Sequence, residues 1–161
     1  MAFRQKPFAV VVSCSDSRVP PELLFDAGLG DLFVIRTAGH VLSKESIGSI
    51  EYGVNSAGAN LVIVLGHDDC GAVKAAMSFY KSEKQRELSE NLSSVLNFIY
   101  PVVDNCKPSD SIDDVVVSNI HYQVEELKKD KNLLGKLENK ELMIIGAKYN
   151  LKTGMVDFYE D

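Results

Sequence analysis

The chain lacks the features that mark several large classes of protein. It has no tryptophan, only three cysteines, and no apolar stretch near the roughly 20 residues that a membrane-spanning helix needs. Three irregularly spaced cysteines do not suggest a disulfide framework, and the apolar run after Lys6 is too short for a secretory signal. We therefore expect a soluble, cytoplasmic protein in which cysteine is kept for metal binding or chemistry.

Basic side chains are in the minority. The 161 residues include 17 lysines and arginines against 23 aspartates and glutamates, which gives a net charge of −6. An acidic chain argues against a nucleic acid or an anionic membrane as a partner. No repeat or flexible linker divides the sequence, so we expect a single domain over 1–161, able to bury roughly two thirds of its unfolded surface.

Short apolar runs alternate with segments of helical spacing. The runs show no clean alternation of apolar and polar residues, which is typical of strands buried on both faces of a parallel sheet. The strand candidates are 8–13, 32–36, 61–65 and 142–145, with 155–159 as an edge strand. The helix candidates are 22–25, 46–57, 71–80, 85–100 and 111–129. This order predicts an α/β fold, a three-layer α/β/α domain around a mostly parallel sheet of four to five strands.

Polar residues end the first apolar run and form the first chemical motif, "CSDSR". Its Cys14, Asp16 and Arg18 stand two positions apart, so in an extended segment their side chains point the same way. A bidentate contact with Arg18 would hold Asp16 ionised and oriented. Taken alone, the cysteine is a small buried hydrophobe, and the charged pair is a helix cap with a surface ion pair.

A second motif, "HDDC", follows the third apolar run, with His67 and Cys70 three positions apart. Because the carboxyl ends of parallel strands meet at one edge of a sheet, the two motifs can meet there. Cysteine sulfur and histidine nitrogen suit tetrahedral zinc, and three protein ligands leave a fourth position for water, as in catalytic zinc sites. Together the motifs predict a zinc site formed by Cys14, His67 and Cys70.

"CSDSR", followed 53 residues after its cysteine by "HDDC", resembles the β-class carbonic anhydrases. The intervening "PPELLFDAGLGDLFVIRTAGHV" and "GSIEYGV" also resemble that family, and the likeness runs from Gln5 to about Ala76. The resemblance implies an enzyme, a carbonic anhydrase that reversibly hydrates carbon dioxide to bicarbonate and a proton. It implies Zn²⁺ as cofactor, bound by Cys14, His67 and Cys70, with zinc-bound hydroxide as the nucleophile.

The resemblance also implies the residues around the metal. Asp16 and Arg18 match the catalytic dyad, and Asp16 matches a fourth zinc ligand of a closed, inactive state formed as the pH falls. A homodimer or homotetramer is implied as well, although the helical arm with which many members begin does not match any segment of this chain. The matching substrate-binding positions are Gln5, which acts from a neighbouring subunit in plant-type members, Phe33 and Tyr52 as an apolar wall, and the backbone amide at Gly71.

The same residues are compatible with different functions. Cys14 followed by Arg18 also resembles phosphatase loops, although the aspartate between them would repel a phosphate. As alternatives, the motifs also fit a non-catalytic zinc protein, closed permanently by Asp16, or a relative that hydrolyses carbon disulfide or carbonyl sulfide. As proton shuttles, His40 and His121 are weak candidates that we interpret first as solvated histidines.

Overall fold

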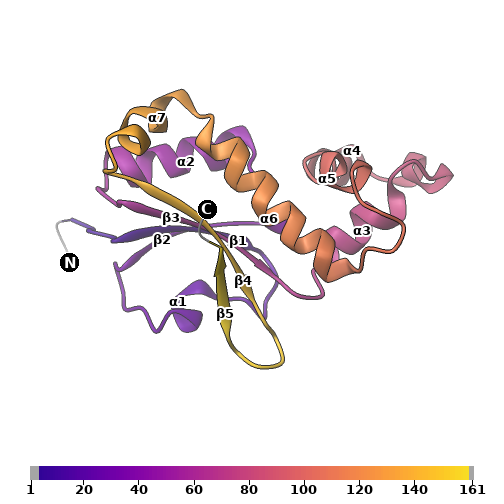
Figure 1. The fold of residues 1–161 in the computed structure, drawn as a ribbon, viewed down its shortest axis with the longest axis horizontal. Coiled ribbons are helices and arrows are strands. Elements are labelled where there is room, and N and C mark those ends of the chain that lie inside the picture. Colours follow the sequence, from indigo (N-terminus) through magenta and orange to yellow (C-terminus); the bar gives the residue numbers. More distant parts are fainter. Residues whose placement is uncertain (1–3, 160–161) are drawn as a thin grey trace.

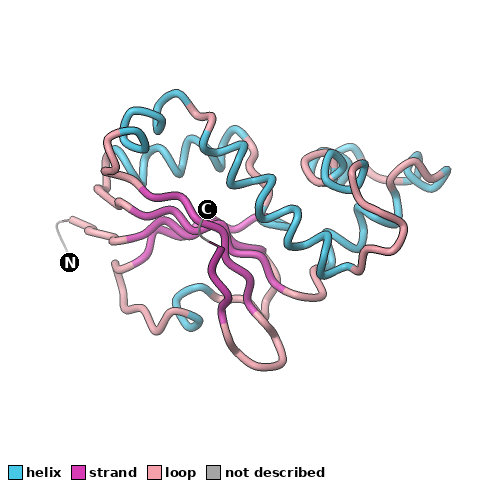
Figure 2. The backbone as a smooth tube through the Cα atoms, viewed as in Figure 1, coloured by secondary structure: helices cyan, strands magenta, loops and turns pink. Residues whose placement is uncertain are grey.

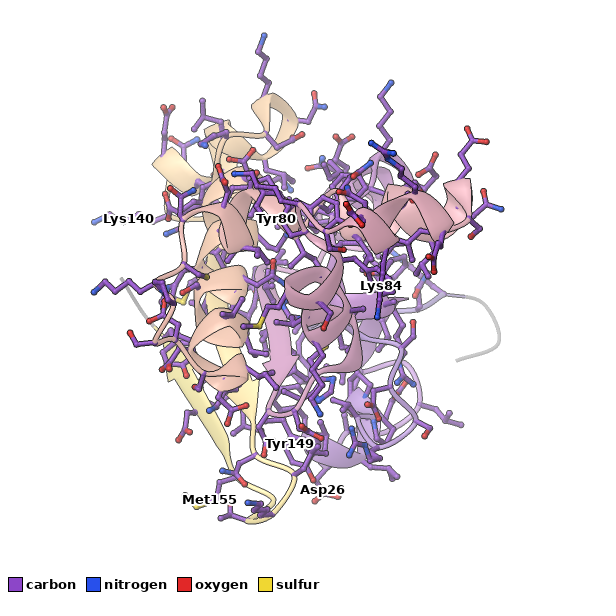
Figure 3. The ribbon with its side chains drawn as sticks, turned by 90° about the vertical axis from the view of Figure 1, so that its right-hand side faces the viewer. Asp26, Tyr80, Lys84, Lys140, Tyr149 and Met155 are labelled. Atoms are coloured by element: carbon purple, nitrogen blue, oxygen red, sulfur yellow. The ribbon has the colours of Figure 1, made fainter. Side chains whose placement is uncertain are left out.

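The fold is built around a sheet of five strands, seen in a computed structural model that describes residues 4–159 (Figure 1). The strand order is β2-β1-β3-β4-β5. The first four strands run parallel, and β5 pairs antiparallel with β4, which confirms the predicted mostly parallel sheet. The strands are β1 (Ala9–Cys14), β2 (Leu32–Thr37), β3 (Leu61–His67), β4 (Met143–Tyr149) and β5 (Val156–Tyr159). Figure 3 labels Tyr149, at the end of β4, and Met155, in the turn before β5.

Helices cover the two faces of the sheet unequally. One face carries α2 (Lys44–Asn55), α6 (Ile112–Lys128) and α7 (Lys131–Glu138), whereas the short α1 (Pro21–Leu24) lies on the other (Figures 1 and 2). Four further helical elements form a lobe beyond the end of β3: α3 (Gly71–Phe79), η2 (Glu83–Glu87), α4 (Glu90–Leu96) and α5 (Tyr100–Asp104). The predicted α/β fold is confirmed. Within residues 4–159, no helix combines the length and apolarity that crossing a bilayer requires.

The first strand shows why the apolar runs lack alternation. All six residues of β1 are buried. Val10 and Val12 pack with core residues of α2 and α6, while Val11 packs on the opposite face with Leu24 of α1. Because both faces are covered, every position of the strand is apolar or small.

The segment 85–100 differs from its prediction as one helix. It contains the end of η2, a break, α4 and the first residue of α5. Ser89 begins a new helix by accepting a hydrogen bond from the Leu92 amide, 3.2 Å away. Pro101 then lies in the first turn of α5, where its missing N–H costs nothing. Capping residues therefore divide a segment whose apolar spacing alone favours a continuous helix.

Helix α7 was not predicted from the sequence. It begins after Asp130, whose side chain accepts a hydrogen bond from the Asn132 amide at 2.8 Å. Its Leu133 is completely buried in the core shared by β1, β3 and α2. Gly135, in the middle of the segment, lowers its helical propensity, so burial of Leu133 rather than local preference stabilises the helix.

Close contact between α6 and the sheet depends on two glycines. Ile120 of α6 lies over Gly66 of β3 and Gly146 of β4. A Cβ atom at Gly66 would lie 2.6 Å from Ile120 Cδ1, and one at Gly146 would lie 2.6 Å from Ile120 Cγ2. The helix can therefore approach β3 and β4 this closely only because these two positions carry no side chain.

We expect Gly146→Ala to lower the free energy of unfolding by about 1–3 kcal/mol, because the added methyl group overlaps Ile120 in a packed core. Urea denaturation followed by circular dichroism measures the change. Gly48→Ala is the matched control, because a Cβ at this α2 position meets nothing within 4 Å, and it should raise stability by about 0.5–1 kcal/mol. Unchanged stability in Gly146→Ala would contradict the close packing of α6.

Candidate metal centre

Three potential metal ligands meet where β1 and β3 end. Ser13 pairs with Leu65, so Cys14 and His67 leave the sheet at the same edge. Cys70 follows shortly after β3 as the residue that precedes α3. The sulfur atoms of Cys14 and Cys70 are 4.0 Å apart, and the ligand atoms of the three buried residues all lie within 4.8 Å of one another.

The donor set fits a tetrahedral zinc ion. His67 Nδ1 lies 2.8 Å from the carbonyl oxygen of Asp68, which favours a proton on Nδ1 and a free lone pair on Nε2. That Nε2 is buried and has no hydrogen-bond partner. Two sulfurs bound at about 2.3 Å in a tetrahedral site lie about 3.8 Å apart, close to the separation seen here. A bound metal ion would satisfy the otherwise unpaired nitrogen.

The two sulfurs are electrostatically unequal. Contact with the Cys70 thiol holds the pKa of Cys14 well below its usual range, and burial opposes this effect. The backbone amide of Gly39 adds a donor 3.4 Å from the Cys14 sulfur. The same contact between the two sulfurs raises the pKa of Cys70. Cys14 is therefore the sulfur that ionises more readily, and a metal ion bound by both sulfurs would displace the proton of Cys70.

Asp16 lies beside this cluster and is held by Arg18. The guanidinium Nε donates to Asp16 Oδ1 at 2.9 Å, and Nη2 donates to Oδ2 at 2.8 Å. This bidentate contact, expected from the "DSR" spacing, holds the pKa of the Asp16 carboxyl well below its usual range. Asp16 Oδ2 is 3.9 Å from His67 Nε2. An ionised, oriented carboxylate therefore faces the three ligands.

Two further residues fix the backbone around the cluster. Arg36 of β2 donates to the carbonyl oxygen of Cys14 at 2.9 Å and to that of Asp16 at 2.6 Å. The buried carboxylate of Asp68 accepts a hydrogen bond from the Leu151 amide at 2.7 Å and so ties the β4–β5 turn to the end of β3. Neither contact has a signal in the sequence, because both use backbone atoms from distant segments.

The four predicted substrate positions divide into two groups. Gly71 begins α3 directly after Cys70. Phe33 instead pairs with Val10 near the start of β1, and its ring is centred 6.0 Å from that of Tyr52. Gln5 is exposed ahead of β1. Because a six-residue strand spans about 20 Å, Gln5, Phe33 and Tyr52 lie near the opposite end of β1 from the metal ligands of the same chain.

The two histidines considered as proton shuttles have different environments. His40 is completely buried, and burial lowers its pKa to about 4, so the ring is neutral near pH 7. Its interpretation as a solvated histidine is therefore wrong, because the turn η1 (Ala38–His40) places it under α6. His121 is exposed, as expected.

Comparisons with known proteins agree with this geometry. A family model described as carbonic anhydrase matches residues 9–156. The carbonic anhydrase of Mycolicibacterium smegmatis is 37% identical, over 95% of this chain and 75% of the relative. The solved Coccomyxa β-carbonic anhydrase in complex with acetazolamide is 25% identical, with a TM-score of 0.87 over 98% of this chain and 74% of that one.

A second solved structure shares the fold. It comes from a study of two tetrameric β-carbonic anhydrases of Sordaria macrospora, is 20% identical, and gives a TM-score of 0.83 over 99% of this chain and 84% of that one. The expectation that the chain is an enzyme of this kind is confirmed by the family model and the mycobacterial relative. From sequence and structure together, the chain belongs to the β-class carbonic anhydrase family.

Proposed function

We propose that the protein reversibly hydrates carbon dioxide to bicarbonate and a proton, with Zn²⁺ held by Cys14, His67 and Cys70. The observation that carries this proposal is the buried, unpartnered Nε2 of His67 beside two cysteine sulfurs. When bound, zinc lowers the pKa of a water molecule so that hydroxide is available near neutral pH. Use of Cys14 as a phosphatase nucleophile is disfavoured, because the ionised Asp16 beside it repels phosphate.

Asp16 and Arg18 act as a dyad in this proposal. The contact with Arg18 keeps Asp16 deprotonated, so Oδ2 accepts a hydrogen bond from the attacking water and orients it toward the substrate. A closed state with Asp16 on the metal requires both contacts with Arg18 to break. The pairing therefore favours the open arrangement.

The product proton leaves by way of solvent. His40 is buried and neutral, which makes it unsuitable as a carrier to the surface. A cavity beside Arg18 opens next to the dyad instead, and its polar lining includes Asp68, Asp69, Ser111 and Asp113. We propose that water or buffer in this cavity accepts the proton directly.

The pocket is completed in a homodimer or homotetramer. Gln5, Phe33 and Tyr52 lie a strand length from their own chain's ligands, so we assign them to the pocket of a neighbouring subunit. The tetrameric assembly named for the Sordaria macrospora relative supports this proposal. Residues 1–161 then act as one zinc domain, and three free cysteines suit the reducing cytoplasm.

Metal removal tests the proposed chemistry. Stopped-flow assay of carbon dioxide hydration on zinc-quantified protein should show activity at about one zinc per chain, loss on chelation, and recovery when zinc is restored. Zinc-loaded protein without activity would indicate a non-catalytic zinc protein instead. Parallel assays with carbon disulfide and carbonyl sulfide distinguish relatives that act on sulfur analogues.

Asp16→Ala should reduce the rate of hydration by about 100-fold or more while zinc content stays at the wild-type level, because the metal ligands are unchanged and the orienting carboxylate is lost. Stopped-flow kinetics and metal analysis on the same sample give both values. Asp157→Ala, which removes an exposed carboxylate from β5, should leave both unchanged. Full activity in Asp16→Ala would eliminate the proposed dyad.

Mixing two variants tests the shared pocket. Gln5→Ala and Asp16→Ala should each be impaired, but refolding them together should recover up to about half of the wild-type activity in mixed dimers. If Gln5 serves the neighbouring site, one pocket of each mixed dimer has both residues intact. If Gln5 serves its own chain, no pocket is repaired, and the activity of the mixture stays at the average of the two variants.

A further inference from the structure

A buried polar network joins α6 to the turn η1. Asn119 of α6 is completely buried; its Nδ2 donates to the carbonyl oxygen of Gly39 at 3.1 Å and lies 2.9 Å from His40 Nε2. One helical turn later, Gln123 donates from Nε2 to Asn119 Oδ1 at 3.2 Å. Gln123 Oε1 in turn accepts a hydrogen bond from the Leu42 amide at 3.3 Å.

The network has a defined polarity. Because Gln123 donates to Asn119 Oδ1, the amide nitrogen of Asn119 faces the turn with both of its hydrogens. One hydrogen goes to Gly39 O and the other to His40 Nε2. The side-chain amides of Asn119 and Gln123 thus form hydrogen bonds through both oxygen and nitrogen, as buried polar groups require.

The turn held by Asn119 contacts a metal ligand. The backbone amide of Gly39 donates to the Cys14 sulfur at 3.4 Å. Gly39 has φ of +70°, and a Cβ there would lie 2.9 Å from Ile99 Cδ1, so the turn adopts a conformation that favours glycine in a tightly packed place. Asn119 therefore binds the carbonyl oxygen of Gly39, and the N–H of the same glycine faces the Cys14 sulfur.

We propose that Asn119 is a positioning residue for the metal centre, which it serves by aiming the Gly39 amide at the Cys14 sulfur. The inference rests on the proposed zinc site. An N–H···S hydrogen bond draws charge away from the thiolate, so the sulfur donates less charge to the metal. Two sulfur ligands would weaken zinc as a Lewis acid, and the hydrogen bond from the Gly39 amide would preserve part of that acidity.

The neighbours of Asn119 show that packing alone does not require an amide here. Val115, Val116 and Ile120 bury the adjacent positions of α6 with apolar side chains. A leucine at 119, which has the same branched shape, would continue this surface, but it would leave Gly39 O and His40 Nε2 without their donor. Asn119→Leu therefore removes the hydrogen bonds and keeps the branched shape of the side chain.

Asn119→Leu tests the proposal in the intact chain. We expect zinc to bind about 10- to 100-fold more weakly, because the turn that holds Cys14 in place loses its support from α6 and this loss of orientation outweighs the extra charge on the sulfur. Competition with a chelating dye measures the affinity. In the cobalt-substituted protein, the sulfur-to-cobalt charge-transfer band should move to lower energy, because the sulfur regains charge. The Gly39 amide proton should also shift upfield in the NMR spectrum as its hydrogen bond weakens.

Two further variants separate positioning from folding. Gln123→Met keeps Asn119 but removes the donor that orients its side chain. It should change the zinc affinity, the charge-transfer band and the Gly39 amide shift in the same direction as Asn119→Leu, but by less. Val124→Ala removes a buried side chain of the same helix that packs in a different part of the core. This control should lower the Tm without changing zinc affinity or the charge-transfer band.

Each result has a distinct meaning. If Asn119→Leu lowers the Tm as Val124→Ala does but binds zinc and cobalt like the wild type, Asn119 is only structural and the inference is overturned. If Asn119→Leu does not fold, the Gln123→Met variant decides. The inference is overturned if that variant has the zinc affinity and the cobalt charge-transfer spectrum of the wild type. If the wild type itself binds neither zinc nor cobalt through sulfur, the proposed function fails first and the inference fails with it.

Discussion

Parallel pairing between β1 and β3 is the constraint on which the candidate metal centre depends. The pairing of Ser13 with Leu65 places Cys14 and His67 at one edge of the sheet, although they are 53 residues apart in the chain. Both strands are buried on two faces, so the register is specified by packing on both sides. A slip of one residue in β1 would turn Cys14 to the opposite face of the sheet. The same hydrophobic contacts that stabilise the fold therefore determine the distance between the ligands.

Charge around the ligands is balanced locally rather than across the molecule. The chain carries a net charge of −6, yet the loop after β1 is held by two guanidinium groups. Arg18 binds the carboxylate of Asp16, while Arg36 binds the backbone carbonyl groups of Cys14 and Asp16. These cations and the Gly39 amide offset the negative charge that sulfur and carboxylate concentrate at this edge. The contact with Arg18 keeps Asp16 ionised.

The sequence was sufficient to predict the strands and the meeting of Cys14, His67 and Cys70, because each motif directly follows an apolar run. Local spacing carries that information, as it does for the contact between Asp16 and Arg18. The position of His40 under α6 was missed, since a histidine after two small residues in a loop has no pattern that indicates burial. Contacts such as Arg36 to the Cys14 carbonyl use backbone atoms, whose partners depend on tertiary packing rather than on residue type.

The distance between the two ends of β1 has a consequence for regulation. The ligands lie at the carboxyl end, and the proposed apolar wall lies near the amino end of the same strand. An enzyme whose pocket is divided in this way depends on assembly as well as on metal loading. Dilution would then inactivate it while every chain still held its ion, and a defective subunit would impair the site of an intact neighbour. In the proposed assembly, subunit concentration would be a second control on turnover, independent of metal supply.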